Sequence, residues 1–344
     1  MESIYYVLTW LCHRTCPHCY EDRFRPYYGA DRERVVGESR HNYARIIANF
    51  PERLVYRDGS SSGDSTSGDS TGEKPGTVIL AGGEVLLDAV REPALYPALD
   101  LLWERYDGNV GLVVQTTGDL VTERIVGELL DHHASVISVS GVDHFHAGLE
   151  EPEAQAALRE KLTRIFERFG MHYGGTREPA AAPRFHFFGA TADAWIGKLW
   201  PRGRAWQNGL STADLTENFC NRWSGGLGFL NAGLAGSEVS VDPDGNVYPC
   251  CLKTRLPVGN LLEEPLEAIL RRRARDPVYQ AISAGQPQRM GLAHGWSEAM
   301  FIEKSRIVTP DGKPYANLCI GCDRFHEEVL MPPATALVSI GGGV

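Results

Sequence analysis

The stretch LCHRTCPHCY, residues 11–20, is the most informative part of the sequence because it places three thiols on one short segment. Three residues separate Cys12 from Cys16, and two separate Cys16 from Cys19. Cysteine thiolates hold iron–sulfur clusters, and a four-iron cluster normally takes four of them. Three protein ligands would leave one iron open to a small molecule. A closed zinc site fits this spacing less well, because such sites pair C-x₂₋₄-C with further ligands downstream.

Composition excludes several classes of protein. The 344 residues are 43% hydrophobic and 23% charged, as in ordinary globular proteins, and the net charge is −10. That charge disfavours nucleic acid or an anionic membrane as the main partner. No apolar run reaches the ~18 residues of a membrane span, and the N-terminus has no basic region or cleavage site. We therefore expect a cytoplasmic protein, whose eight cysteines serve metal rather than disulfides.

Strand and helix patterns alternate over the first two thirds of the chain. Such alternation predicts an α/β fold with a parallel sheet and helices outside it. Apolar strand patterns cover residues 4–10, 77–81, 110–117, 135–140 and 184–190, and helical spacing covers residues 31–50, 92–106, 120–132 and 150–170. Residues 57–75 lack any large apolar side chain, which predicts a disordered insert. Because the alternation then stops and glycine becomes dense, we expect two domains, residues 1–210 and 211–344.

The second group of thiols lies in the C-terminal third. VDPDGNVYPCC, residues 241–251, predicts a hairpin with DG as its turn, which ends at Cys250. CIGC supplies the pair Cys319 and Cys322, and Cys220 makes a fourth thiol able to surround one cluster. Cys251 is the spare thiol, although an exchange with Cys250 stays open. A zinc ion held by the same four residues is the alternative interpretation.

The spacing of Cys12, Cys16 and Cys19, with the CPHCY ending, resembles the signature of the radical S-adenosylmethionine (radical SAM) superfamily. The C-terminal hairpin and CIGC resemble the twitch domain of its SPASM/twitch branch, a shortened SPASM module. The resemblance implies a partial (β/α)6 TIM-like barrel followed by a small α+β twitch domain. It also implies a 4Fe-4S cluster that binds SAM and one auxiliary 4Fe-4S cluster.

Other motifs carry the same resemblance and imply cofactor contacts. AGGEVLL follows the second strand of the barrel, and its Gly82, Gly83 and Glu84 resemble the GGE motif that holds the amino group of SAM. QTTGDL resembles the TNG turn, with Thr117 where asparagine is usual and Thr116 as a candidate contact. SVSGVDHFH resembles the S-x-D-G motif, with Ser138 matching and Ser140 where aspartate is common. PRGRA resembles a late GRA turn, whose Arg204 reaches the SAM site or serves the fold.

Asp143, His144 and His146 follow the fourth strand and are expected at the mouth of the barrel. A histidine there can move a proton to or from substrate, so these three residues are the catalytic candidates. Hydrogen-bonded loop residues are the alternative interpretation of the same side chains.

The resemblance implies an oxidoreductase that cleaves SAM to a 5′-deoxyadenosyl radical, removes hydrogen from a substrate carbon and passes an electron to the auxiliary cluster. A flavodoxin or ferredoxin would supply electrons. We expect a ribosomal peptide as substrate. Because the chain starts at its first strand, a small metabolite, as in an aminoglycoside-precursor dehydrogenase, is nearly as well supported. A non-enzymatic iron–sulfur or zinc scaffold is the third possibility, and it leaves the GGE motif unexplained.

Overall fold

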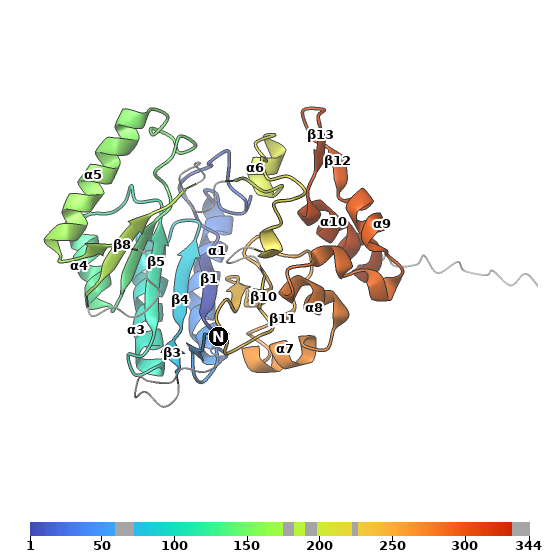
Figure 1. Ribbon diagram of the computed structural model, residues 1–344. Coiled ribbons are helices and arrows are strands. Elements are labelled where there is room, and N and C mark those ends of the chain that lie inside the picture. The colour runs from blue at the N-terminus through green and yellow to red at the C-terminus, as the bar shows by residue number, and fades with distance from the viewer. Residues whose placement is uncertain (59–71, 175–181, 190–197, 222–225, 332–344) are drawn as a thin grey trace, which may run out of the picture.

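The computed structural model describes residues 1–58, 72–174, 182–189, 198–221 and 226–331. A nine-stranded sheet in the order β11-β10-β9-β1-β4-β5-β6-β8-β7 runs through the molecule (Figure 1). This arrangement confirms the predicted α/β class with a central parallel sheet. No helix among these residues is long and apolar enough to cross a membrane.

The parallel part of the sheet follows the order of the chain. β1 pairs with β4, β4 with β5, β5 with β6, and β6 with β8, all in parallel. Their bounds are β1 Ser3–Thr9, β4 Thr77–Gly82, β5 Gly111–Thr116, β6 Val136–Val139 and β8 Arg184–Phe187. β1, β4, β5 and β6 are buried nearly throughout, whereas β8 is only partly buried. The short β7 (His172–Tyr173) pairs outside β8 and leaves the sheet open, as in a partial barrel.

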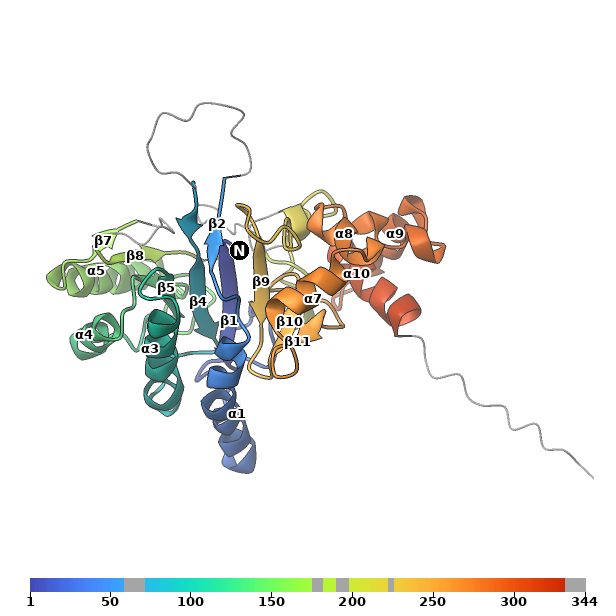
Figure 2. The ribbon, with the colours of Figure 1, turned by 90° about the horizontal axis from the view of Figure 1, so that it is seen from below.

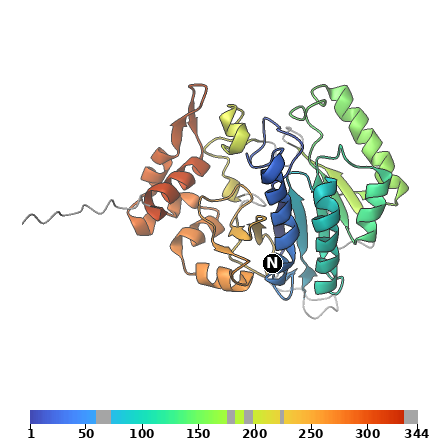
Figure 3. The same ribbon diagram turned by 180° about the vertical axis from the view of Figure 1, so that it is seen from behind.

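Helices cover one face of this parallel sheet. Figures 2 and 3 show α1 and α3 against the same face of the strands. The bounds are α1 Gly29–Ala48, α2 Asp88–Val90, the π-helix η1 Arg91–Leu95, α3 Tyr96–Arg105, α4 Glu123–Asp131 and α5 Pro152–Arg168. Helix α4 shows why such a segment is helical. The Thr122 side chain accepts a hydrogen bond from Ile125 N and so caps the first turn, and the apolar stripe of the helix is buried. The opposite face of the sheet is left for the functional cavity.

The C-terminal part of the chain extends the same sheet. β9 (Glu238–Val241) pairs in parallel with β1, and β10 (Asn246–Tyr248) returns antiparallel to β9, as the predicted hairpin requires. Gly245 turns this hairpin with a φ of +81°, which favours glycine. β11 (Gly259–Asn260) completes the edge. The sheet therefore continues across the domain boundary expected near residue 210, and that boundary stays a prediction.

Short helices fill the remainder of the C-terminal region, beyond the β9 side of the sheet (Figure 1). They are α6 Gly203–Gln207, η2 Phe219–Asn221, α7 Leu266–Arg273, α8 Pro277–Ser283, η3 Pro287–Arg289, η4 Leu292–His294, α9 Glu298–Lys304, α10 Leu318–Phe325 and η5 His326–Leu330. A hairpin of β12 (Arg306–Val308) and β13 (Pro314–Ala316) precedes α10. Two of these elements, η2 and α10, carry cysteines.

The predicted insert lies mostly on residues 59–71, outside the described residues. Its flanks form the antiparallel pair β2 (Val55–Tyr56) and β3 (Lys74–Pro75). Glu73 binds Arg53 and Arg57 at 2.5 and 2.7 Å across this pair. The pair lies at the amino ends of β1 and β4, where Thr77 N donates to Glu2 O. The insert thus joins the sheet at the end opposite the Cys12–Cys19 segment.

Candidate active site

The three N-terminal thiols follow the carboxyl end of β1. Cys12 is buried, and its backbone N donates to Arg25 O at 3.0 Å, which bends the segment back on itself. Burial raises the pKa of the Cys12 thiol to about 12 and that of Cys19 to about 11. With such raised pKa values, these thiols are poorly ionised on their own. They become good metal ligands only when a bound metal stabilises the thiolate. We name residues 12–19 the cysteine loop.

The glycines after β4 lie directly against the cysteine loop. A Cβ on Gly83 would lie 2.3 Å from Leu11 O and 2.9 Å from Cys12 Cβ, so no larger residue fits there. The backbone N of Glu84 donates to Leu11 O at 2.9 Å. Gly82 and Gly83 line the adjoining cavity. The motif therefore presents backbone, rather than side chain, to a bound molecule.

The Glu84 carboxylate is directed away from that cavity. It is 1% exposed and accepts hydrogen bonds from Thr116 Oγ1 at 2.9 Å and from Thr117 N and Oγ1 at 2.8 and 2.7 Å. These bonds tie the end of β4 to the end of β5. Glu84 and Thr116 thus lie one layer behind the cavity wall, whereas Thr117 lines it.

The cavity encloses about 530 Å³ between the cysteine loop, the open face of the sheet and the residues after Cys250. Ser138 and Ser140, both predicted cofactor contacts, line it. Ser138 Oγ and His186 Nε2 lie 2.8 Å apart, and the sheet register places Gln115 beside Ser138 and Ser138 beside His186. Burial lowers the pKa of His186. A row of neutral polar groups therefore crosses three neighbouring strands.

Sequence reasoning missed Gln115 and His186 as site residues. The signal was present, because each is a polar side chain within an otherwise apolar strand. Tyr5, on β1, was missed for the opposite reason, since a tyrosine in a buried strand suggests core. Its hydroxyl lies 3.4 Å from that of Tyr20, and both residues line the cavity.

The three catalytic candidates separate in the structure. Asp143 Oδ1 and His146 Nδ1 lie 2.8 Å apart beside the cysteine loop, and both residues are buried. His144 is exposed and stacks on Phe145 with ring centroids 3.9 Å apart. His18, from the middle of CPHC, joins the buried pair, with its ring centroid 4.9 Å from that of His146. The structure thus brings Asp143 and His146 into the cavity and leaves His144 outside.

Burial and neighbouring charges shift the pKa values of the two buried histidines, His18 and His146. Burial alone lowers the pKa of His146, but its bonds to Asp143 and Cys16 outweigh burial and raise it to about 9. Burial lowers the pKa of His18 to about 4. Asp143 Oδ2 has no hydrogen-bond partner within the described residues, and the same is true of His18 Nδ1. These buried atoms are available to a bound molecule.

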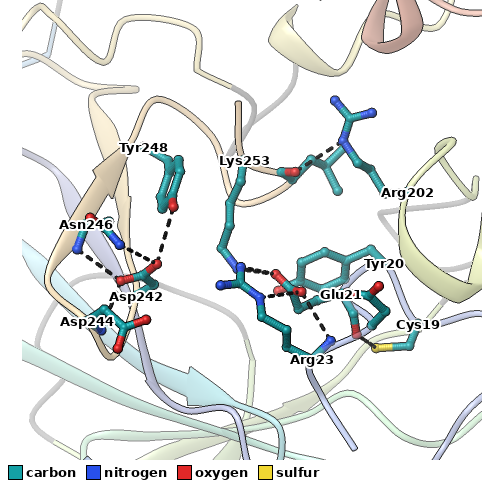
Figure 4. Close-up of polar contacts among 12 residues, drawn as sticks. Cys19, Tyr20, Glu21, Arg23, Arg202, Asp242, Asp244, Asn246, Tyr248 and Lys253 are labelled. Atoms are coloured by element: carbon teal, nitrogen blue, oxygen red, sulfur yellow. Dashed lines mark hydrogen bonds and ion pairs between the residues drawn. The ribbon is translucent and has the colours of Figure 1, made fainter. Parts of the chain in front are cut away.

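Two arginines of the PRGRA turn hold the two thiol regions. Arg204 donates to Cys16 O at 2.9 Å, to Phe24 O at 2.8 Å and to Asp22 O at 3.1 Å, so it clamps the cysteine loop while it lines the cavity. Arg202 donates to Leu252 O at 3.2 Å (Figure 4) and pairs with Asp323 at 2.8 Å. Burial lowers the pKa of Arg202, but Asp323 and the thiols of Cys319, Cys322 and Cys250 outweigh this and raise it.

The C-terminal thiols converge around Arg202. Cys220 comes from η2, Cys250 follows β10, and Cys319 and Cys322 lie on α10. Burial raises the pKa of Cys250 to about 11 and that of Cys319 to about 12. Cys220 interacts electrostatically with the other three. Cys251 instead lines the main cavity, so the geometry favours Cys250 as the ligand.

One group of possible metal ligands is drawn together without a thiol. Across the described residues, only His18, Asp143 and His146 have three ligand atoms within 4.8 Å of one another. Zinc–sulfur bonds of about 2.3 Å in a tetrahedron would put the sulfurs of one zinc site roughly 3.8 Å apart. No three thiols of the described residues lie that close together.

Comparison with known protein families agrees with the sequence prediction for the C-terminal part of the chain. Residues 234–323 match the family described as SPASM, an iron–sulfur cluster-binding domain. This match agrees with the iron–sulfur domain predicted for the region that contains Cys250, Cys319 and Cys322. No curated protein matches the chain in sequence.

Solved structures are similar at low identity. BtrN in complex with AdoMet and 2-DOIA is 13% identical, with 83% of this chain and 87% of that chain covered and a TM-score of 0.42. Native anSMEcpe with bound AdoMet and Cp18Cys peptide is 12% identical, with 96% of each chain covered and a TM-score of 0.41. Streptococcus suis SuiB bound to precursor peptide SuiA is 11% identical, with 82% and 66% covered and a TM-score of 0.41.

Proposed function

We propose that this chain, which carries a SPASM iron–sulfur cluster-binding domain at residues 234–323, is a radical SAM enzyme. The observation that carries the proposal is the contact of Gly83 with the cysteine loop. A loop of three thiols thereby borders a cavity, and the part of the cavity wall next to the loop is the glycine backbone of residues 82 and 83. A scaffold that only holds metal has no need of such a cavity.

Cys12, Cys16 and Cys19 would hold one 4Fe-4S cluster, and Cys220, Cys250, Cys319 and Cys322 the auxiliary one. SAM bound at the first cluster would supply, on one-electron reduction, a 5′-deoxyadenosyl radical able to take hydrogen from carbon. The backbone of Gly82 and Gly83 would receive its amino group. The unpartnered Asp143 Oδ2, with Ser138 and Ser140, would accept or donate hydrogen bonds to its polar groups.

We assign a net oxidation to the enzyme. Four thiols around the auxiliary cluster leave no open iron for substrate, so its role would be to accept an electron from the substrate radical. Leu252 and Phe219 line the cavity and also pack with Trp200 against Cys250 and Cys319. The wall of the cavity is therefore in contact with the auxiliary ligands, which supports electron transfer from substrate in that direction. The thiols need a reducing compartment, which supports a cytoplasmic location.

A ribosomal peptide is the substrate that we propose first. A small metabolite with several hydroxyl or amide groups is the second candidate. The row of Gln115, Ser138 and His186 favours the metabolite, because these neutral side chains can form hydrogen bonds with uncharged hydroxyl or amide groups.

The test is formation of 5′-deoxyadenosine by anaerobically reconstituted protein given SAM and a reductant. We expect turnover in the wild type, and none when Cys12, Cys16 and Cys19 are replaced together by alanine. Those replacements should remove the iron of one cluster and keep that of the other. Transfer of deuterium from labelled candidate substrates into 5′-deoxyadenosine would identify the substrate class. Zinc as the only bound metal, without SAM cleavage, would contradict the proposal.

A further inference from the structure

The end of the main cavity far from the cysteine loop is walled by one layer of apolar groups. Tyr5, Ile79, Val113 and Val136 all line the cavity, and they come from β1, β4, β5 and β6. The sheet register places Tyr5 beside Ile79, Ile79 beside Val113, and Val113 beside Val136. We call these four residues the cavity floor. Nothing in the proposed chemistry of SAM uses it.

The side chains of the cavity floor are directed into the cavity. Successive residues of a strand point to opposite faces of the sheet. Ile79 is 6% exposed, Val113 8% and Val136 6%. The residues that directly follow them belong to the helix-covered face and are 0% exposed: Leu80, Val114 and Ile137. Tyr5 contributes its ring, since its hydroxyl interacts with Tyr20 and Gln115. The floor is therefore an apolar surface that an apolar part of a bound molecule would cover favourably.

Neutral hydrogen-bonding groups lie one layer nearer the cysteine loop. Gln115 is two residues after Val113, and Ser138 is two residues after Val136, with His186 beside it. Two residues of strand correspond to about 7 Å. His186 Nδ1 is buried and has no hydrogen-bond partner within the described residues. A glutamine amide both donates and accepts hydrogen bonds, so it complements another amide group.

The charged side chains of the main cavity belong to other parts of its wall. Arg14 lies between Cys12 and Cys16 in the chain, Arg204 donates to Cys16 O, and Lys198 pairs with Glu217 at 3.4 Å. A charged group placed on the cavity floor would be buried among apolar side chains, which is costly. A ring with hydroxyls all round would satisfy the polar row but would turn other hydroxyls to the floor, where Thr77 at the far end adds one hydroxyl.

We propose that the cavity floor is a specificity pocket for one large apolar side chain of a peptide substrate, with the backbone amide of that residue at Gln115 and His186. The inference rests on the proposed function and deepens it, because it assigns the type of residue that the enzyme accepts. The spacing of about 7 Å between the two layers fits leucine, methionine or phenylalanine. Alanine is too short to reach the floor from the same backbone position.

The first experiment compares capped peptides that differ in one side chain. N-acetyl-Gly-X-Gly-amides, in which X is fully deuterated leucine, phenylalanine, alanine or aspartate, are given separately to anaerobic, reduced protein with SAM. We expect deuterium to enter 5′-deoxyadenosine from the leucine and phenylalanine peptides about tenfold faster than from the other two, because each methylene in an apolar pocket contributes roughly that factor. Calorimetric titration of the same peptides into unreduced protein with SAM should give the same order of affinity without turnover.

Two variants change the depth of the cavity floor in opposite directions. Val113→Phe fills the floor and should erase the preference for leucine over alanine. Ile79→Ala deepens the floor and should raise the preference for phenylalanine over leucine by about tenfold. Each preference is a ratio within one variant, so a smaller folded fraction does not alter it. Ile137→Ala is the matched control: it makes the same truncation on the helix-covered face and should keep the wild-type order of peptides.

The outcomes separate the pocket from the proposed function. Equal behaviour of the leucine and aspartate peptides, in rate and in affinity, would overturn the pocket. Deuterium transfer from deuterated inositol, a hydroxylated ring, but from none of the peptides would overturn it as well. Absence of 5′-deoxyadenosine from the wild type under every condition would instead contradict the proposed function, and the calorimetric order would still decide the pocket.

Discussion

Lys253 Nζ lies 2.5 Å from Glu21 Oε2, and this buried ion pair joins the segment after Cys19 to the segment after Cys250 (Figure 4). Glu21 is 8% exposed and Lys253 is 9% exposed. Both cations of the group lie over the Trp10 ring, with Lys253 Nζ 4.4 Å and Arg23 Cζ 3.7 Å from the ring centroid. Lys253 adopts a φ of +60°, an unusual conformation for a lysine. The pair therefore holds two thiol-bearing segments, 232 residues apart in the chain, in one arrangement.

Lys253→Met should destabilise the protein by about 3 kcal/mol, because it leaves the Glu21 charge buried with only Arg23 as partner. Thermal unfolding of the anaerobic protein, followed by tryptophan fluorescence, would measure this loss. Lys313→Met removes an exposed lysine that pairs with Asp311, and it should have little effect. Equal unfolding temperatures for the two variants would contradict a structural role for the buried pair.

The contribution of Glu21 should not change across neutral pH. Burial raises the pKa of Glu21, but Arg23 and Lys253 outweigh burial and lower it to about 2. A carboxylate with a lowered folded pKa stabilises the protein fully above its unfolded pKa of about 4.3 and loses that contribution as pH falls toward 2. The infrared difference spectrum between wild type and Glu21→Gln should therefore show an ionised Glu21 carboxylate that does not change from about pH 6 to 8. A difference that changed with pH in that range would contradict the assignment.

Gly83→Ala should abolish most of the SAM cleavage. The added methyl group would meet Leu11 O at 2.3 Å and displace the cysteine loop. Misplacement of a reacting centre by about 1 Å can cost roughly 100-fold in rate. Gly37→Ala in α1 is the matched control, because the nearest side-chain atom would lie at 3.8 Å. Rates of 5′-deoxyadenosine formation measure both, and a fully active Gly83→Ala enzyme would refute the close-approach argument.

Cys250→Ala and Cys251→Ala should differ in iron content, although the residues are adjacent. Cys250 faces Arg202 and the other C-terminal thiols, whereas Cys251 lines the main cavity. We expect Cys250→Ala to lose the four irons of the auxiliary cluster and Cys251→Ala to keep them. Iron analysis with electron paramagnetic resonance of the reduced proteins would decide. Loss of iron in Cys251→Ala alone would mean that the two thiols exchange roles.

His146→Ala should weaken iron binding by the cysteine loop by about 10–100-fold, as expected when a residue that supports a metal ligand is removed. His146 is held by Asp143 and hydrogen-bonds to Cys16. His144→Ala is the neighbouring control, because His144 is exposed and should not affect iron. Iron release to a chelator under anaerobic conditions measures the difference. Equal iron release from both variants would mean that His146, like His144, is an ordinary loop residue.

Local patterns in the sequence determined much of this protein. The βα alternation predicted a parallel sheet with helices outside it, and the DG turn predicted the β9–β10 hairpin. The resemblance of the C-terminal hairpin and CIGC to a twitch domain implied an iron–sulfur domain, and residues 234–323 match an iron–sulfur cluster-binding family. These features depend on residues close together in the chain or on the period of their side chains, so they can be read without coordinates.

Only the tertiary structure decided which distant groups meet. It paired β9 with β1, turned Glu84 toward Thr116 and Thr117, and aligned Gln115, Ser138 and His186 across three strands. It also joined Glu21 to Lys253. Strand register and loop packing set these contacts, and no local spacing encodes them. The chemistry available to the chain was therefore visible in its sequence, whereas the geometry that brings the two thiol regions to one cavity was not.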